Sequence, residues 1–137
     1  MARPSDMMGL GMSAHLAKIV GVHVSSVTAG GSSAGSATQI GGNNRTVIVN
    51  ASNSGSGIKL PAVNADTGVL IGDELIIANL LSAAVQCYAA NNALGSVVKI
   101  FMDGGSIVGT TGFSVSSGKP VIMVPITVST WIGIRSV

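Results

Sequence analysis

Charged side chains are scarce in this chain of 137 residues, where Asp, Glu, Lys and Arg together make up 9%. An average soluble domain is about 25% charged, so ionic groups cannot cover the surface of an ordinary monomer here. Much of the surface must be uncharged, and uncharged surface is less costly to desolvate in an assembly. We therefore expect an oligomer or a component of a larger assembly. A monomer solvated by Ser, Thr and Asn is the alternative.

Features that bind nucleic acid are also missing. The net charge is only +2, the seven basic residues are spread along the whole chain, and the aromatic residues number one Trp, one Tyr and two Phe. Nucleic-acid binding needs a basic stripe or a row of stacking aromatics. We expect no nucleic-acid partner.

The chain has one cysteine and two histidines. Cys87 has no partner for an intrachain disulfide, and its alternating apolar surroundings predict a buried core thiol. His15 and His23 have no cysteine or carboxylate at a metal-ligand spacing. We expect no metal site and no cofactor.

Long apolar runs are absent as well. No stretch of about 18 apolar residues occurs, and charge and glycine interrupt the first residues of the chain. We expect no transmembrane helix, no signal peptide and no membrane partner, with synthesis in the cytoplasm.

What the sequence does contain is a series of short apolar runs separated by Gly, Pro, Asn and Asp, most clearly over residues 56–88. Many of these runs alternate with period 2, which is typical of strands with one buried face. From residue 46 onward the pattern predicts about nine or ten short strands. The expected fold is mainly β: a compact antiparallel β-sandwich or barrel, jelly-roll-like, over residues 46–137.

Residues 1–21 differ from this pattern. Ser5 and Ser13 are candidate N-caps of two short helices, and Gly21 is a natural stop. Helices this short need a surface to pack on, and methionine adapts well to a foreign one. Docking on a partner protein and capping of the chain's own β-domain both remain open. The apolar docking residues would be Met7, Met8, Leu10, Met12, Leu16 and Ile19.

Residues 22–45 join these two parts. They contain the low-complexity stretch AGGSSAGSA, which has the composition of a flexible linker. We expect a Gly/Ser-rich arm here, with a long surface loop as the alternative.

Catalytic chemistry is not visible in the sequence. The β-domain contains no histidine, and its only acids are Asp66, Asp73, Glu74 and Asp103. Asp73 and Glu74 are adjacent, so on a strand they face opposite sides and cannot act as an acid–base pair. Asp73 and Asp103 each have a neighbouring glycine, which is typical of turns. We expect that the protein is not an enzyme.

The few aromatic residues allow two interpretations. Trp131, with Tyr88, Phe101 and Phe113, could form a sugar-binding platform, but packing in the core or between subunits is the commoner role. We predict subunit contacts at Ile107, Phe113 and Trp131.

Short motifs in the β-domain form a recognisable series when they are taken in chain order. Before them, near the N-terminus, GLGMSA stands at residues 9–14 and is followed by LA at 16–17 and by Gly21. The series reads GIKLPA at 57–62, GDELIIAN at 72–79, VQCY at 85–88, GSIVG at 105–109, GKPV at 118–121 and Trp131.

This series resembles small virion structural proteins of tailed bacteriophages, of the capsid decoration (cement) or head-fibre type. The extra apolar strand within residues 91–102 departs from the pattern and leaves the layout of the sheets open. The resemblance implies a homotrimer on the capsid exterior of a virion, with the major capsid protein as its partner. Residues 1–21 would dock on the capsid, and binding only to the assembled shell would stabilise it.

Two other functions remain as alternatives. The first is a head fibre, knob or tail-fibre adaptor with a host-facing β-domain. The second, from a different class, is a glycan-binding or hydrolase module, against which the lack of a histidine in the β-domain argues.

Overall fold

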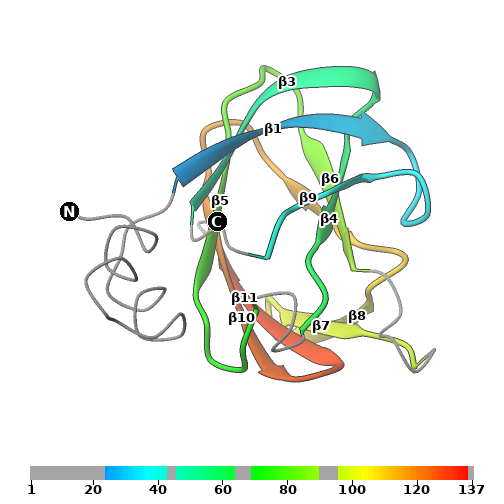
Figure 1. Cartoon of the computed structure of the whole chain (residues 1–137), viewed down its shortest axis with the longest axis vertical. Helices are drawn as coiled ribbons and strands as arrows, with labels where there is room; N and C mark the ends of the chain where they lie inside the picture. The colour runs from blue at the N-terminus through cyan, green and yellow to red at the C-terminus, as the bar shows by residue number, and fades with distance from the viewer. Residues whose placement is uncertain (1–23, 43–45, 64–68, 90–95, 136–137) are drawn as a thin grey trace, which may run out of the picture.

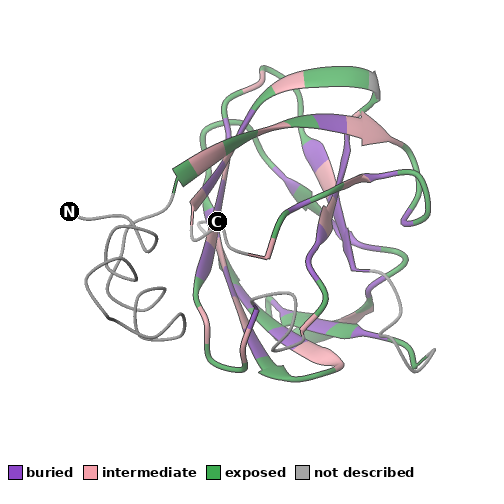
Figure 2. Ribbon diagram, viewed as in Figure 1, coloured by how far each residue is buried: buried purple, intermediate pink, exposed green. Residues whose placement is uncertain are grey.

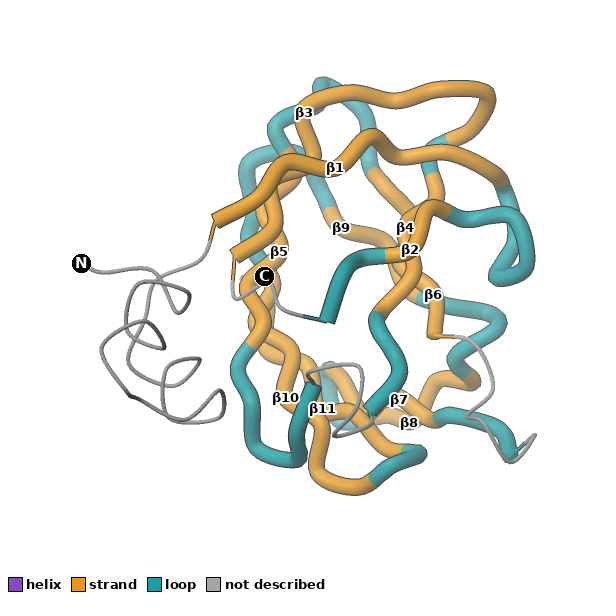
Figure 3. The backbone as a smooth tube through the Cα atoms, viewed as in Figure 1, coloured by secondary structure: helices purple, strands orange, loops and turns teal. Residues whose placement is uncertain are grey.

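The structure is a computed structural model that describes residues 24–42, 46–63, 69–89 and 96–135. The predicted helices of residues 1–21, with their six docking residues, lie outside this part of the chain. The described residues are mainly β and form two sheets (Figures 1 and 3).

The larger sheet has seven strands in the order β1-β3-β5-β10-β11-β7-β8. Its strands are β1 (Val24–Gly31), β3 (Thr46–Gly55), β5 (Leu75–Asn79), β10 (Val121–Thr127), β11 (Thr130–Arg135), β7 (Lys99–Met102) and β8 (Gly105–Val108). The smaller sheet has four strands in the order β2-β4-β6-β9. Its strands are β2 (Thr38–Gln39), β4 (Gly57–Leu60), β6 (Val85–Ala89) and β9 (Phe113–Val115).

Both sheets are mixed, which corrects the prediction of an antiparallel fold. Strands β1, β3 and β5 are parallel neighbours in the large sheet, and β2, β4 and β6 are parallel neighbours in the small one. From β1 to β7 the chain alternates between the sheets, so that β2 and β4 lie on the crossovers between the parallel neighbours β1, β3 and β5, and β3 and β5 lie on those between β2, β4 and β6. Alternation of apolar residues reveals a strand and its buried face, but the direction of its neighbours depends on these crossovers.

One hydrophobic core lies between the sheets. Its largest fully buried members include Trp131, Ile100 and Met123 from the seven-stranded sheet and Ile58 from the four-stranded sheet. Figure 2 shows the buried positions alternating with exposed ones along the strands. The period-2 pattern of the sequence thus becomes the inner and outer faces of the sheets.

The range predicted as a flexible arm contains two strands in its described part. Strand β1 pairs along its whole length with β3, and β2 pairs with β4. Small residues are needed here because backbones approach closely: a Cβ added to Gly55 would lie 2.4 Å from the Gly31 carbonyl oxygen. Gly55 also has a φ of 133°, a region that L side chains rarely adopt. The Gly and Ser composition therefore serves close packing in this segment.

Two turns predicted from Asp–Gly signals are confirmed. Asp103 and Gly104 both have positive φ and connect β7 to β8 as a tight hairpin. The Asp73 carboxylate accepts a hydrogen bond from the Leu70 backbone N–H at 2.9 Å, and the Asp73 N–H donates to the Leu70 carbonyl at 3.0 Å. This pair of bonds closes the turn before β5.

Candidate interaction surface

The outer face of the seven-stranded sheet carries apolar side chains in two rows. In the first row the register places Ile76 of β5 beside Ile122 of β10, and Ile122 beside Ile134 of β11. In the second row Val124 of β10 lies beside Ile132 of β11, and Ile132 beside Phe101 of β7. We call these six residues the apolar face: Ile76, Phe101, Ile122, Val124, Ile132 and Ile134.

These side chains point away from the core because their neighbours along each strand point into it. On β11, Trp131 and Gly133 are buried, whereas Ile132 and Ile134 are 39% and 63% exposed. On β7, Ile100 and Met102 are buried and Phe101 is 44% exposed. Ile76, Ile122 and Val124 are half-buried. A contiguous patch of this kind marks an interaction surface more often than isolated exposed apolar residues do.

The first row continues toward the edge of the sheet. Ile76 pairs with Thr46 of β3, and Thr46 pairs with Val24 at the start of β1. Val24 is also exposed. The row therefore crosses five strands with no charged residue in it.

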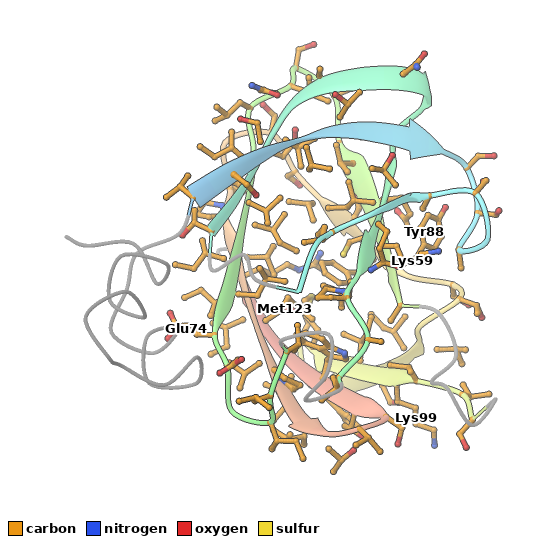
Figure 4. All side chains as sticks on the ribbon, in the orientation of Figure 1. Lys59, Glu74, Tyr88, Lys99 and Met123 are labelled. Carbon is orange, nitrogen blue, oxygen red and sulfur yellow. The ribbon has the colours of Figure 1, made fainter. Side chains whose placement is uncertain are left out.

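Two charges of opposite sign lie at the flanks of the apolar face. Glu74 directly precedes Leu75 of β5 and shares the outward orientation of Ile76, and Lys99 begins β7 and shares that of Phe101. Both are exposed. Figure 4 shows them on opposite sides of the molecule, Glu74 beside β5 and Lys99 beside β7.

The outer face of the four-stranded sheet is polar by contrast. Lys59 and Gln86 are half-buried and Ser114 is exposed. Gln39 at the edge donates through its Nε2 to the carbonyl oxygens of Ile40 and Leu60, at 3.1 and 2.9 Å. The amide of Gln39 thus satisfies backbone carbonyls at this edge, and the face carries polar side chains rather than apolar ones.

Tyr88 occupies the same outer face but is covered by the chain itself. Its hydroxyl donates to the Ser32 carbonyl at 3.0 Å, and its ring lies in a small buried cluster with Ala34 and Ala37. The segment between β1 and β2 therefore closes over this part of the four-stranded sheet. Figure 4 shows Tyr88 and Lys59 together at this side.

One buried polar side chain connects the sheets. Asn79, at the end of β5, is 1% exposed. Its Nδ2 donates to the Ala83 carbonyl at 2.8 Å and to the Val115 carbonyl of β9 at 2.9 Å, while its Oδ1 accepts from the Leu81 N–H at 2.9 Å. All of these groups are satisfied, so Asn79 acts as a structural bridge.

A second bridge lies at the surface. Arg135 of β11 forms an ion pair with Asp103 in the β7–β8 turn, and its Nη1 donates to the Ser114 carbonyl of β9 at 2.9 Å. The pair is solvent-exposed, so its contribution to stability is small, about 0.2–1 kcal/mol.

The reactive side chains of the described residues are few. Complete burial raises the pKa of the Cys87 thiol by desolvating its thiolate, which keeps it protonated and unreactive. Among the described residues, no group of three or more His, Cys, Asp or Glu side chains could hold a metal ion. A search of the same residues also finds no helix long and apolar enough to span a membrane.

Two of the three residues predicted at subunit contacts lie in the core of the single chain. Phe113 and Trp131 are 4% and 2% exposed, and Ile107 is partly buried against the same core. Their side chains leave little surface for a neighbouring subunit. Phe113, Trp131 and Tyr88 are all buried and Phe101 is exposed on the outer face of the seven-stranded sheet, so the four do not form an open platform for a sugar ring.

Sequence reasoning missed the apolar face, although a signal for it exists. The strands that form it are apolar at nearly every position: LIIA in β5, VIMV in β10 and WIGI in β11. Near-continuous apolar runs indicate strands with both faces covered, whereas a single covered face gives strict alternation. Here one face is covered by the core and the other is exposed on the single chain.

No protein-family model, curated protein or solved structure was found to match this chain.

Proposed function

We propose that the protein is a non-enzymatic structural component of a tailed-phage virion, a capsid decoration (cement) protein that binds the assembled shell as a homotrimer. It would be made in the host cytoplasm and would act on the capsid exterior, with the major capsid protein as its partner. The resemblance of the sequence motifs supports the phage context. We also propose that the two sheets pack as a β-sandwich.

One structural observation carries the assembly part of this proposal: an uncharged apolar face that spans four neighbouring strands and is exposed on the single chain. Large exposed apolar patches are rare on monomers and frequent where a protein contacts another. The scarcity of charge, at 9%, agrees with this role because charged residues are depleted at the centre of such interfaces.

A decoration protein stabilises its shell by mass action. It binds the assembled capsid and not the free capsid subunit, so that disassembly requires its release. Several docking segments held together in one oligomer add avidity without new contacts. Residues 1–21 are proposed as these docking segments through Met7, Met8, Leu10, Met12, Leu16 and Ile19.

The test combines the recombinant protein with empty capsids of the phage whose genome encodes it. We expect co-sedimentation with the shells and a rise in their melting temperature. A variant lacking residues 1–21 should lose shell binding while it keeps the same number of subunits per oligomer as the full chain. Undiminished binding by the truncated variant would overturn the docking role.

The same experiment distinguishes the alternatives. A soluble oligomer that ignores the shells would favour the fibre, knob or tail-adaptor function. Turnover of a cell-wall or capsule polysaccharide by the purified protein would instead favour the hydrolase module and overturn the structural proposal.

A further inference from the structure

We propose that the apolar face is the contact between copies of this chain, with the β5 flank of one copy packed against the β7 flank of the next. The inference rests on the proposed function, which requires self-association, and it names the surface through which the copies meet. The test below uses the free protein without capsids, so that self-association and shell binding can fail separately.

The occupant must be apolar where it meets the centre of the face. Ile122, Ile132 and Ile134 meet there in two adjacent rows, with no charged residue among them. A second copy of the chain offers the same kind of surface, and burial of apolar area on both partners is the dominant favourable term in association.

The charges at the flanks fit a second copy as well. Glu74 lies at the β5 flank and Lys99 at the β7 flank (Figure 4). When identical copies turn this face toward a common symmetry axis that runs along the strands, the β5 flank of each lies against the β7 flank of its neighbour. Every contact then joins one Glu74 to one Lys99, whereas a contact between like flanks would place equal charges together.

The shape of the sheet favours a closed ring. Figure 1 shows that the seven-stranded sheet curves, from β1 and β3 through β5 to β10 and β11 and then to β7 and β8. The outer face of a curved sheet presents two flanks in different directions, so that each flank can meet a different neighbour. Such head-to-tail contacts close into a cyclic oligomer when the rotation fits.

The first experiment places a charge at the centre of the face and measures native mass by sedimentation. Ile134→Asp should weaken self-association on the order of a hundredfold or more and yield the 13.5 kDa monomer, because a buried unpaired carboxylate is strongly unfavourable. The matched control is Leu80→Asp: Leu80 is also 63% exposed but lies in the loop after β5, outside the apolar face. The control should keep the native mass of the wild type.

The second experiment reverses the flanking charges. Glu74→Lys and Lys99→Glu should each weaken association about fivefold at low salt, because like charges then face each other across the contact. The double variant should regain the affinity of the wild type, since each contact again joins opposite charges. Recovery in the double variant is a result that a loss of folding could not produce.

Three results would overturn this inference. The first is a wild-type protein that is monomeric at all concentrations. The second is an oligomer whose mass is unchanged by Ile134→Asp. The third is a monomer that binds a dye for exposed apolar surface only after residues 1–23 are removed. The chain's own N-terminal segment would then cover the apolar face in place of a second copy.

Discussion

The outer faces of the two sheets differ although strands of the same chain build both. The seven-stranded sheet presents Ile122, Ile132 and Ile134, whereas the four-stranded sheet presents Lys59 and Gln86 and is partly closed by the chain's own segment before β2. One sheet is complete as a monomer, and the other exposes side chains of the kind that normally lie inside. Comparison of the side chains on the two outer faces therefore identifies the face that needs a partner.

The largest effect is expected where the chain passes from one sheet to the other. Gly55→Ala should lower the free energy of unfolding by about 3 kcal/mol, because the new Cβ meets the Gly31 carbonyl and the φ is unfavourable. Both faces depend on this junction, so the variant should lose them together. Chemical denaturation measures the change, and Gly104→Ala, whose Cβ meets nothing within 4 Å, is the control for a glycine at positive φ.

The second-largest effect is expected at Asn79, which connects the two sheets. Asn79→Ala should lower the free energy of unfolding by about 2–3 kcal/mol, because it removes the three hydrogen bonds of this buried side chain to the Ala83 and Val115 carbonyls and the Leu81 N–H. Denaturant titration of the purified variant tests this value. A loss below about 0.5 kcal/mol would show that the bridge contributes little.

The Cys87 thiol gives a pH test of the shared core. Burial raises its pKa above the ordinary value of 9.0, so the folded state disfavours the thiolate. The resulting stability is fully present below pH 9 and is lost as the pH rises above it, by up to about 1.4 kcal/mol per pH unit. Cys87→Ala should lack this slope between pH 9 and 10.5. Equal slopes for the two proteins would show that the thiol is accessible to water.

The smallest effects compare the two outer faces directly. Tyr88→Phe should cost the monomer about 1 kcal/mol, because the Ser32 carbonyl loses its donor. Ile134→Thr should change the stability of the monomer by less than about 0.5 kcal/mol, because its side chain is mostly exposed. Denaturation at a concentration where the protein is monomeric tests both. The reverse order of effects would contradict the contrast between the faces.

The sequence predicted the strands well where a β-branched run met a clear turn. The TVIV run of β3, the VQCY run of β6 and the Asp103–Gly104 hairpin follow from local chemistry and lie where they were expected. Local chemistry cannot tell which strands become neighbours, because the crossovers that make β1, β3 and β5 parallel pass through the other sheet. The Gly/Ser composition of residues 24–39 was likewise ambiguous between flexibility and close backbone packing.

The candidate surface was harder to predict than the strands. Alternation assigns residues to two faces of a strand but does not say which face the core covers, and Trp131 was therefore predicted at a subunit contact. In the structure Trp131 points inward, and Ile132 and Ile134 point outward. The docking segment over residues 1–21 remains a prediction from composition.

The native mass of the free wild-type protein tests the central claim most directly. Sedimentation over a wide range of concentrations should give a multiple of 13.5 kDa that persists in the Leu80→Asp control and is lost in Ile134→Asp. A 13.5 kDa species at every concentration would contradict the account, because the apolar face would then be exposed without a second copy to cover it.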